Sequence, residues 1–221
     1  MNATAGNVPS RGTVRPSPAH RWTTHVRAGG IFLVLAILVS GLAYPAVVTG
    51  IAEVVDPFAA NGSLLRCPNG TIVGSADIAQ NLSAGALGPG LFWARPSLTD
   101  YNTTLGAATP PGPSDQALYW LLRNETLYYM TTENLTENSS PNASLPFWWV
   151  APSASSVDPD ITPPAALVQI PRVHAATNLS NGTLLDLVNN HTTQPPLPGL
   201  GVPFVDVLEL DIALLALEGR C

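Results

Sequence analysis

The chain contains no lysine, so its positive charge rests on nine arginines among 221 residues. No aspartate or glutamate precedes Glu53, and the basic stretch before it carries four arginines: Arg11, Arg15, Arg21 and Arg27. The remainder holds all 15 acidic residues and five arginines. This acidic part is a poor partner for nucleic acid. The lack of lysine also removes the usual phosphate contact of a nucleotide-binding P-loop.

Cysteine and histidine are scarce, which restricts metal and nucleophilic sites. Beyond residue 56 the only histidines are His174 and His191, and the two cysteines are Cys67 and Cys221. This set does not match zinc-ligand spacing, and neither a calcium loop nor a Gly-x-Ser-x-Gly elbow occurs. We therefore expect no metal site and no catalytic residues. Both histidines are interpreted as helix-surface residues.

Charged residues are absent from residues 28–52, a run of 25 residues. A helix needs only ~20 apolar residues to cross a bilayer, so the run predicts a transmembrane helix at 29–55 behind a basic arm at 1–28. A cleaved signal peptide is the alternative, but its apolar region is normally ~7–15 residues long. Pro45 is expected to kink the helix.

Two signals predict the orientation in the cell membrane. Arginines before the helix favour a cytoplasmic amino terminus, which leaves residues 56–221 as an extracytoplasmic domain. Independently, 12 of 14 asparagines occupy Asn-x-Ser/Thr glycosylation triplets, against about two expected by chance. Eleven lie beyond the helix: Asn61, Asn69, Asn81, Asn102, Asn124, Asn134, Asn138, Asn142, Asn178, Asn181 and Asn190. The pattern is typical of a single-pass glycoprotein.

Cys67 and Cys221 share the outer side, where disulfides persist. An intramolecular bridge between them would tie the carboxyl end to the start of the domain. A free thiol and an intermolecular bridge are the alternatives that the sequence leaves open.

Local patterns in residues 56–221 predict an α+β domain. Asn-Gly turns indicate a hairpin within 61–83, a cap at Ser114 begins a helix, and polar residues 131–146 favour a glycosylated loop. The remaining elements are a strand at 147–150, helices at 164–176 and 180–191, and a strand at 208–212. Asp158 and Asp160 could act as an acid and base pair, but an Asp-Pro turn explains them more simply.

Several blocks, in order, resemble the KdpC family, the C subunit of bacterial and archaeal potassium-transporting P-type ATPases. They include YPAVVTGIAEVV at 44–55, LFWARPSLTDYN at 91–102, SSVDPDITPPAALVQIPRV at 155–173 and VDVLELDIALLAL at 205–217. LGAATPPGPSDQ at 105–116 departs from the family's Gly/Ser/Asn-rich segment. The glycosylation triplets and the absence of lysine further suit an archaeal source.

The resemblance implies a non-catalytic accessory subunit of a high-affinity, ATP-driven potassium uptake complex. Its partners would be a P-type ATPase catalytic subunit, which uses the ATP, and a potassium-channel-like subunit. The subunit would be needed for assembly of the complex. It would also be needed either for coupling or for raising the ATP affinity of the pumping subunit. The family also implies a nucleotide contact at Gln169. ATP is cytoplasmic, so an outer domain would act on it indirectly, through the transmembrane helix.

Two other functions compete with this interpretation. A membrane-anchored, glycosylated cell-surface binding module would need only the tether and the sugar triplets. An anchored hydrolase using Asp158 or Asp160 is the weaker alternative, because no other residue of the sequence converges on that pair.

Overall fold

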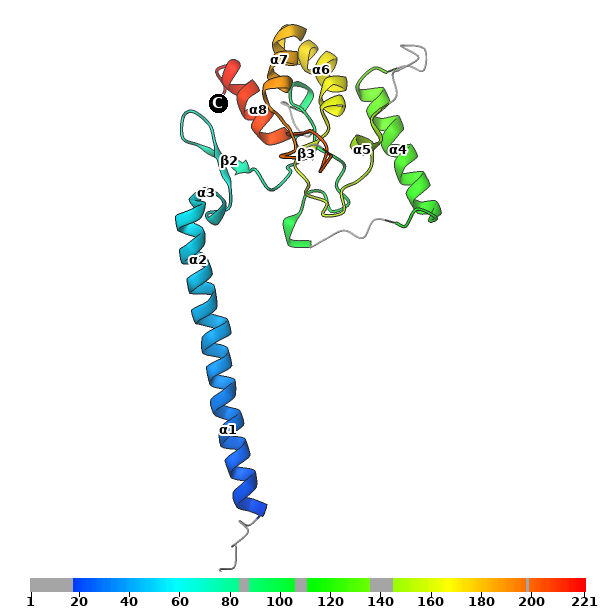
Figure 1. Ribbon diagram of the computed structural model, residues 1–221. Helices are drawn as coiled ribbons and strands as arrows, with labels where there is room; N and C mark the ends of the chain where they lie inside the picture. Colours follow the sequence, from blue (N-terminus) through cyan, green and yellow to red (C-terminus); the bar gives the residue numbers. More distant parts are fainter. Residues whose placement is uncertain (1–17, 84–87, 106–110, 136–144, 198) are drawn as a thin grey trace, which may run out of the picture. The chain divides into compact units, whose positions relative to one another are not determined.

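The computed structural model describes residues 18–83, 88–105, 111–135, 145–197 and 199–221 (Figure 1). The chain divides into two units, Met1–Ala60 and Asn61–Cys221. Most of the predicted loop at 131–146 lies outside the described residues, together with Asn138 and Asn142.

The described part of the first unit is helical except at Asp56. It consists of α1 (Pro18–Leu38), η1 (Val39–Ala43) and α2 (Tyr44–Val55), followed after Asp56 by the short α3 (Pro57–Ala60). Among the described residues, only the stretch Trp22–Val55 is both long and apolar enough to cross a membrane. Its 34 residues span about 50 Å at 1.5 Å per residue, more than the ~30 Å of a hydrocarbon core. The predicted helix at 29–55 is present, and helical structure begins earlier, at Pro18.

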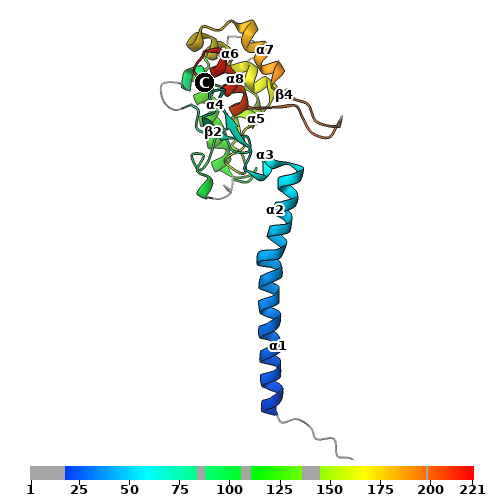
Figure 2. The same ribbon diagram turned by 90° about the vertical axis from the view of Figure 1, so that its left-hand side faces the viewer.

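Pro45 is accommodated by a wider turn immediately before it. The segment η1 is π-helical, and α2 follows with its proline near the first position. Proline lacks an N–H, and its ring clashes with the carbonyl four residues earlier, here that of Gly41. A π-turn relieves this clash within the hydrogen-bond ladder. Figure 2 shows the helix continuing through this region without a break.

The second unit begins with the predicted hairpin. Strand β1 (Leu64–Arg66) pairs antiparallel with β2 (Ile72–Ser75). At the turn, the Asn69 side chain accepts a hydrogen bond from the Thr71 N–H at 2.9 Å. Gly70 has a φ of 86°, which favours glycine. The Asn-Gly signal in the sequence therefore indicated the turn correctly.

A second sheet has three short antiparallel strands in the order β3-β5-β4. These are β3 (Asp160–Ile161), β4 (Thr192–Thr193) and β5 (Phe204–Asp206). The helices around it are α4 (Gln116–Thr132), α5 (Phe147–Val150), α6 (Pro163–Thr177), α7 (Asn181–Asn190) and α8 (Val207–Leu217), with 3₁₀ turns η2 (Gly88–Gly90) and η3 (Thr103–Leu105). The α+β prediction is confirmed.

Side chains cap the helices close to where the sequence predicted. The Asp115 carboxylate accepts from the Ala117 N–H, one residue after the expected cap at Ser114. The Ser180 hydroxyl caps α7 by accepting from the Thr183 N–H. Helix α6 ends at Asn178, whose φ of 60° is the left-handed conformation common at helix ends.

Two predicted strands are wrong. Residues 147–150 form one helical turn, in which the Ala151 N–H donates to the Phe147 carbonyl at 3.0 Å. Only Trp149 and Val150 of that turn are buried. Residues 208–212 belong to α8, because the Asp206 carboxylate caps a helix there by accepting from the Glu209 N–H.

The strand prediction at 208–212 failed because the apolar residues there fit both the period of a strand and the period of a helix. Its alternating Leu-Glu-Leu-Asp-Ile letters also place Val207, Leu210, Asp211 and Leu214 on one helical stripe, and all four are buried. The core around this stripe contains the large, fully buried Trp149, Phe92 and Leu184.

Candidate functional site

The buried segment Leu91–Ala94 is held by side chains of two helices. Asp211 of α8 accepts a hydrogen bond from the Phe92 N–H at 2.8 Å. Gln169 of α6 accepts from the Trp93 N–H at 2.7 Å and donates to the Trp93 carbonyl at 3.1 Å. The two side chains thus do for this segment what a neighbouring strand would do.

Arg172 is the centre of the same network. Its Nε donates to Glu133 at 2.8 Å, and its terminal nitrogens donate to the Pro89 and Leu91 carbonyls and to Gln169, each at 2.8 Å. A fifth, longer bond runs to the Gly88 carbonyl at 3.3 Å. The guanidinium also lies 4.0 Å from the ring centre of Trp93. Helices α4 and α6 are thereby joined to the buried segment through one cation.

Burial controls the two acids of the network. It raises the pKa of Glu133, while the charge and hydrogen bond of Arg172 pull that pKa down. Burial raises the pKa of Asp211 well above its usual value, which favours the neutral carboxyl. One oxygen of each, Glu133 Oε2 and Asp211 Oδ2, has no hydrogen-bond partner among the described residues.

The structure places Gln169 within this network, bonded directly to Arg172. The side chain is fully buried, and its amide bonds to both polar atoms of the Trp93 backbone, to Arg172 and to the Ala165 carbonyl. This leaves the amide no free hydrogen-bonding position that a nucleotide could reach without opening the core.

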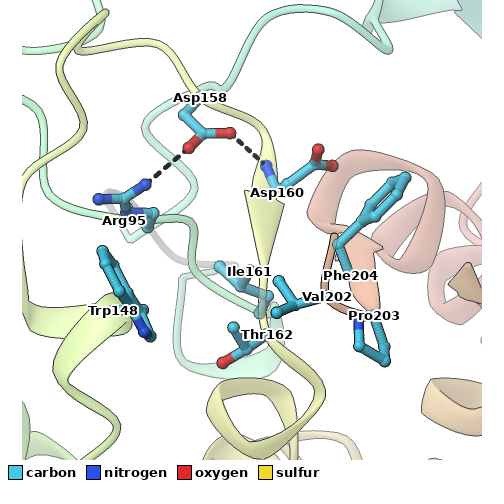
Figure 3. Close-up of a pocket in the computed structure, with 9 residues that line it drawn as sticks. All are labelled: Arg95, Trp148, Asp158, Asp160, Ile161, Thr162, Val202, Pro203 and Phe204. Carbon is cyan, nitrogen blue, oxygen red and sulfur yellow. Dashed lines mark hydrogen bonds and ion pairs between the residues drawn. The ribbon is translucent and has the colours of Figure 1, made fainter. Parts of the chain in front are cut away.

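Arg95 organises a pocket on the surface. It donates to Asp158 at 2.8 Å and to the carbonyls of Ala151 and Pro152 at 3.2 Å. The other oxygen of Asp158 accepts from the Asp160 N–H, as expected for an Asp-Pro turn. Figure 3 shows Arg95, Asp158 and Asp160 linked in this order. The three residues line one edge of a cavity of about 430 Å³.

Asp160 stands opposite Asp206 in the register of β3 and β5. Burial, and then the charges of Asp158 and Glu209, raise the pKa of Asp160 to about 6. Burial and the Glu209 charge raise the pKa of Asp206 to about 6, against hydrogen bonds from the α8 backbone that lower it. Like charges across a strand pair are unfavourable, so this edge favours a proton or a cation.

The two histidines of the second unit lie at helix ends and contact backbone. His174 Nδ1 lies 2.6 Å from the Leu179 carbonyl oxygen, and His191 Nδ1 lies 2.9 Å from that of Leu187. Within the part of the chain that the structure describes, no group of three or more His, Cys, Asp or Glu could hold a metal ion.

Cys67 and Cys221 form a disulfide, with their Cα atoms 5.1 Å apart. Cys67 directly follows β1, so the bridge joins the carboxyl terminus to the first hairpin of the second unit. Of the alternatives open from the sequence, the structure shows the intramolecular bridge.

The sequence reasoning missed Glu133, Arg172 and Asp211. Arg172 lies in a largely apolar helix, and a buried cation needs an acid nearby, so its position was a usable signal. Which acid would pair with it was not readable, because Glu133 is 39 residues away in the chain.

Comparison with known proteins decides the family. The KdpC family, described as the c chain of the K+-transporting ATPase, matches this sequence over residues 26–216. The chain belongs to the KdpC family. The match covers both the apolar helix and nearly all of the second unit, so the resemblance seen in the sequence blocks is confirmed.

Individual relatives agree. A potassium-transporting ATPase KdpC subunit of Geobacter sulfurreducens is 39% identical over 187 residues, covering 83% of this chain and 93% of that protein. The KdpC subunit of Pseudomonas entomophila is 36% identical over 192 residues, 87% of this chain and 95% of its own length. The KdpC subunit of Ralstonia nicotianae is 38% identical over 192 residues, which cover 86% of this chain and 89% of that protein. These relatives are bacterial, so the expected archaeal source gains no support from them.

Proposed function

We propose that this chain is the non-catalytic accessory subunit of an ATP-driven potassium-transport complex. The observation that carries the proposal is the family match over residues 26–216, which spans both units. The interior supports it, because the buried side chains Gln169, Arg172 and Asp211 are engaged with the protein's own backbone and with one another. Neither the cell-surface binding module nor the hydrolase has support from the comparisons.

The proposed arrangement has the amino-terminal arm in the cytoplasm, the helix in the membrane and residues 56–221 outside. The bias of arginines before the helix and the acceptor triplets after it support this orientation. Apolar side chains of the helix, such as Phe32 at 75% and Val54 at 84% exposed, need lipid or partner helices to cover them.

The proposed partners are a P-type ATPase catalytic subunit and a potassium-channel-like subunit. Small residues on the helix suit close packing against them. Apart from the neighbouring residues and the backbone of its own helix, a Cβ added at Gly50 would meet no described atom within 4 Å, and one at Gly41 would meet only the Ile37 side chain, at 4.0 Å. Both positions are therefore open to a neighbouring helix.

ATP is used by the partner subunit in this proposal, and this chain binds no cofactor directly. The buried amide of Gln169 supports that division, because a nucleotide contact there would need the core to open. Any influence on ATP affinity would be indirect. The membrane helix would bind one conformational state of the complex more tightly than another, and the favoured state would bind ATP with a different affinity.

Co-purification from native membranes tests the proposal. Both partner subunits should be recovered with this chain, and deleting it should abolish potassium-stimulated ATP hydrolysis. Gly41→Leu with Gly50→Leu should weaken recovery of the partners, whereas Val48→Leu, a small change on the same helix, serves as the matched control. Normal assembly and transport without this chain would refute the function.

A further inference from the structure

A surface groove in the second unit has apolar walls. Figure 3 shows Trp148 on one side, Val202, Pro203 and Phe204 on the other, and Ile161 with Thr162 between them. Trp148 is 63% exposed although it adjoins the fully buried Trp149. We call this the Trp148 groove.

One wall of the groove continues into a projecting segment between β4 and β5, of which the structure describes residues 194–197 and 199–203. In Figure 2 this segment extends away from the body of the second unit. Three of its apolar side chains are solvent-exposed: Leu197 at 57%, and Leu200 and Val202 each at 67%. Pro195, Pro196 and Pro203 restrict its backbone, which reduces the entropy lost when a partner binds.

The glycosylation triplets avoid the segments that form the walls and floor of the groove. Residues 143–177 and 191–221 contain no asparagine, although eleven triplets occur elsewhere beyond the helix. Trp148, Ile161 and Val202 lie in these stretches. Sugars are bulky and solvated, so a surface kept clear of acceptors is one that protein can contact.

Charge specifies the occupant further. Arg95 is already neutralised by Asp158. Asp160, which lines both this groove and an adjoining pocket with Asp206 and Glu209, has no ion pair among the described residues. A complementary ligand is therefore apolar along its length and carries a positive charge near Asp160.

We propose that the Trp148 groove binds an extended apolar segment of a partner subunit, whose lysine or arginine pairs with Asp160. This inference rests on the proposed function, since it takes the occupant from the same transport complex. Trp148 is the anchor of the contact, because partly exposed tryptophan with apolar neighbours is the residue type that most often dominates binding energy.

The test measures the affinity of the purified full-length chain for the detergent-solubilised partner subunits. Trp148→Ser and Val202→Asp should each weaken binding about 10- to 100-fold, the range typical of central interface residues. Trp120→Ser is the matched control, because Trp120 is a 47% exposed tryptophan on α4, outside the groove. It should leave the affinity unchanged.

The charge is tested by Asp160→Asn, which should weaken binding several-fold, and by Asp160→Arg, which should weaken it more. Asp186→Asn, an exposed acid on α7, is the control. Melting temperatures no lower than that of the wild type, together with an intact disulfide, would show that each variant is folded. Affinities within twofold of wild type for Trp148→Ser and Val202→Asp would overturn the proposal.

A photoreactive benzoylphenylalanine in place of Trp148 identifies the occupant directly. Cross-linking in the assembled complex should attach it to a partner segment that contains lysine or arginine. Attachment to lipid, or to a second copy of this chain, would overturn the inference while leaving the accessory function intact. Failure of the wild-type chain to bind any transport subunit would instead refute the proposed function.

Discussion

Replacing Arg172 by methionine would disrupt the buried network. The change keeps an unbranched apolar stem but removes five hydrogen bonds and the only cation paired with Glu133 in the described part of the chain. The Glu133 side chain has no exposed surface, so solvent would not replace the lost partner. Leaving one member of a buried ion pair unpaired costs ~3–5 kcal/mol. For a unit of this size that lowers the melting temperature by about 6–20 °C.

The assay is denaturant unfolding of the full-length chain in detergent, followed by tryptophan fluorescence. Trp93 and Trp149 report the transition, because both are buried in the folded unit and become exposed to solvent on unfolding. Arg123→Met is the matched control, since Arg123 is an exposed arginine on α4, and it should change the unfolding free energy by less than ~0.5 kcal/mol.

A second variant separates the ion pair from general loss of packing. Glu133→Leu combined with Arg172→Met removes both charges, and buried pairs replaced by apolar residues are often neutral in stability. The double variant should therefore recover a large part of the loss seen for Arg172→Met. The reasoning is refuted if Arg172→Met costs less than ~1 kcal/mol, or if the double variant is no more stable than the single one.

Three further predictions concern other parts of the chain. Thiol labelling of the denatured, unreduced protein should find neither Cys67 nor Cys221 free, and reduction should cost ~4–5 kcal/mol for a 154-residue separation. The pKa values of about 6 for Asp160 and Asp206 lie above the usual 3.8, so the two carboxyls stabilise the folded state fully below pH 3.8 and lose this contribution as pH rises through 6. Asp160→Asn should flatten that pH dependence of the unfolding free energy. An unfolding free energy that rises from pH 4 to 6.5 would contradict the prediction. Protease added to intact cells after sugar removal should digest the region beyond Asp56 and spare the amino-terminal arm, and protection of the large unit would reverse the proposed orientation.

Local patterns in the sequence determined the elements whose stability is local. The uncharged run at 28–52 is enough to define a helix for the membrane, because length and apolar content alone decide whether a segment can span. The Asn69-Gly70 turn and the Ser180 cap were readable for a similar reason, since each satisfies its hydrogen bonds within a few residues. Ordered blocks of sequence also sufficed to identify the family.

Where a stretch of sequence is compatible with both a strand and a helix, only the tertiary structure determined which of the two forms. Phe147–Val150 has strand-forming residues, yet its helical turn buries the adjacent Trp149 and Val150 together, whereas a strand would point them to opposite faces. Residues 208–212 alternate like a strand, but the cap at Asp206 and burial of Leu210 and Leu214 favour a helix. Packing outweighs propensity in such short segments.

The same limit applies to the functional surfaces. Arg172 meets Glu133 across 39 residues and Leu91 across 81, so no sequence spacing indicates the network that holds them. The Trp148 groove likewise combines α5, β3 and the segment before β5, which only the folded chain brings together. Short-range hydrogen bonds and apolar runs are determined by neighbours in the sequence, whereas buried ion pairs and grooves are determined by neighbours in space.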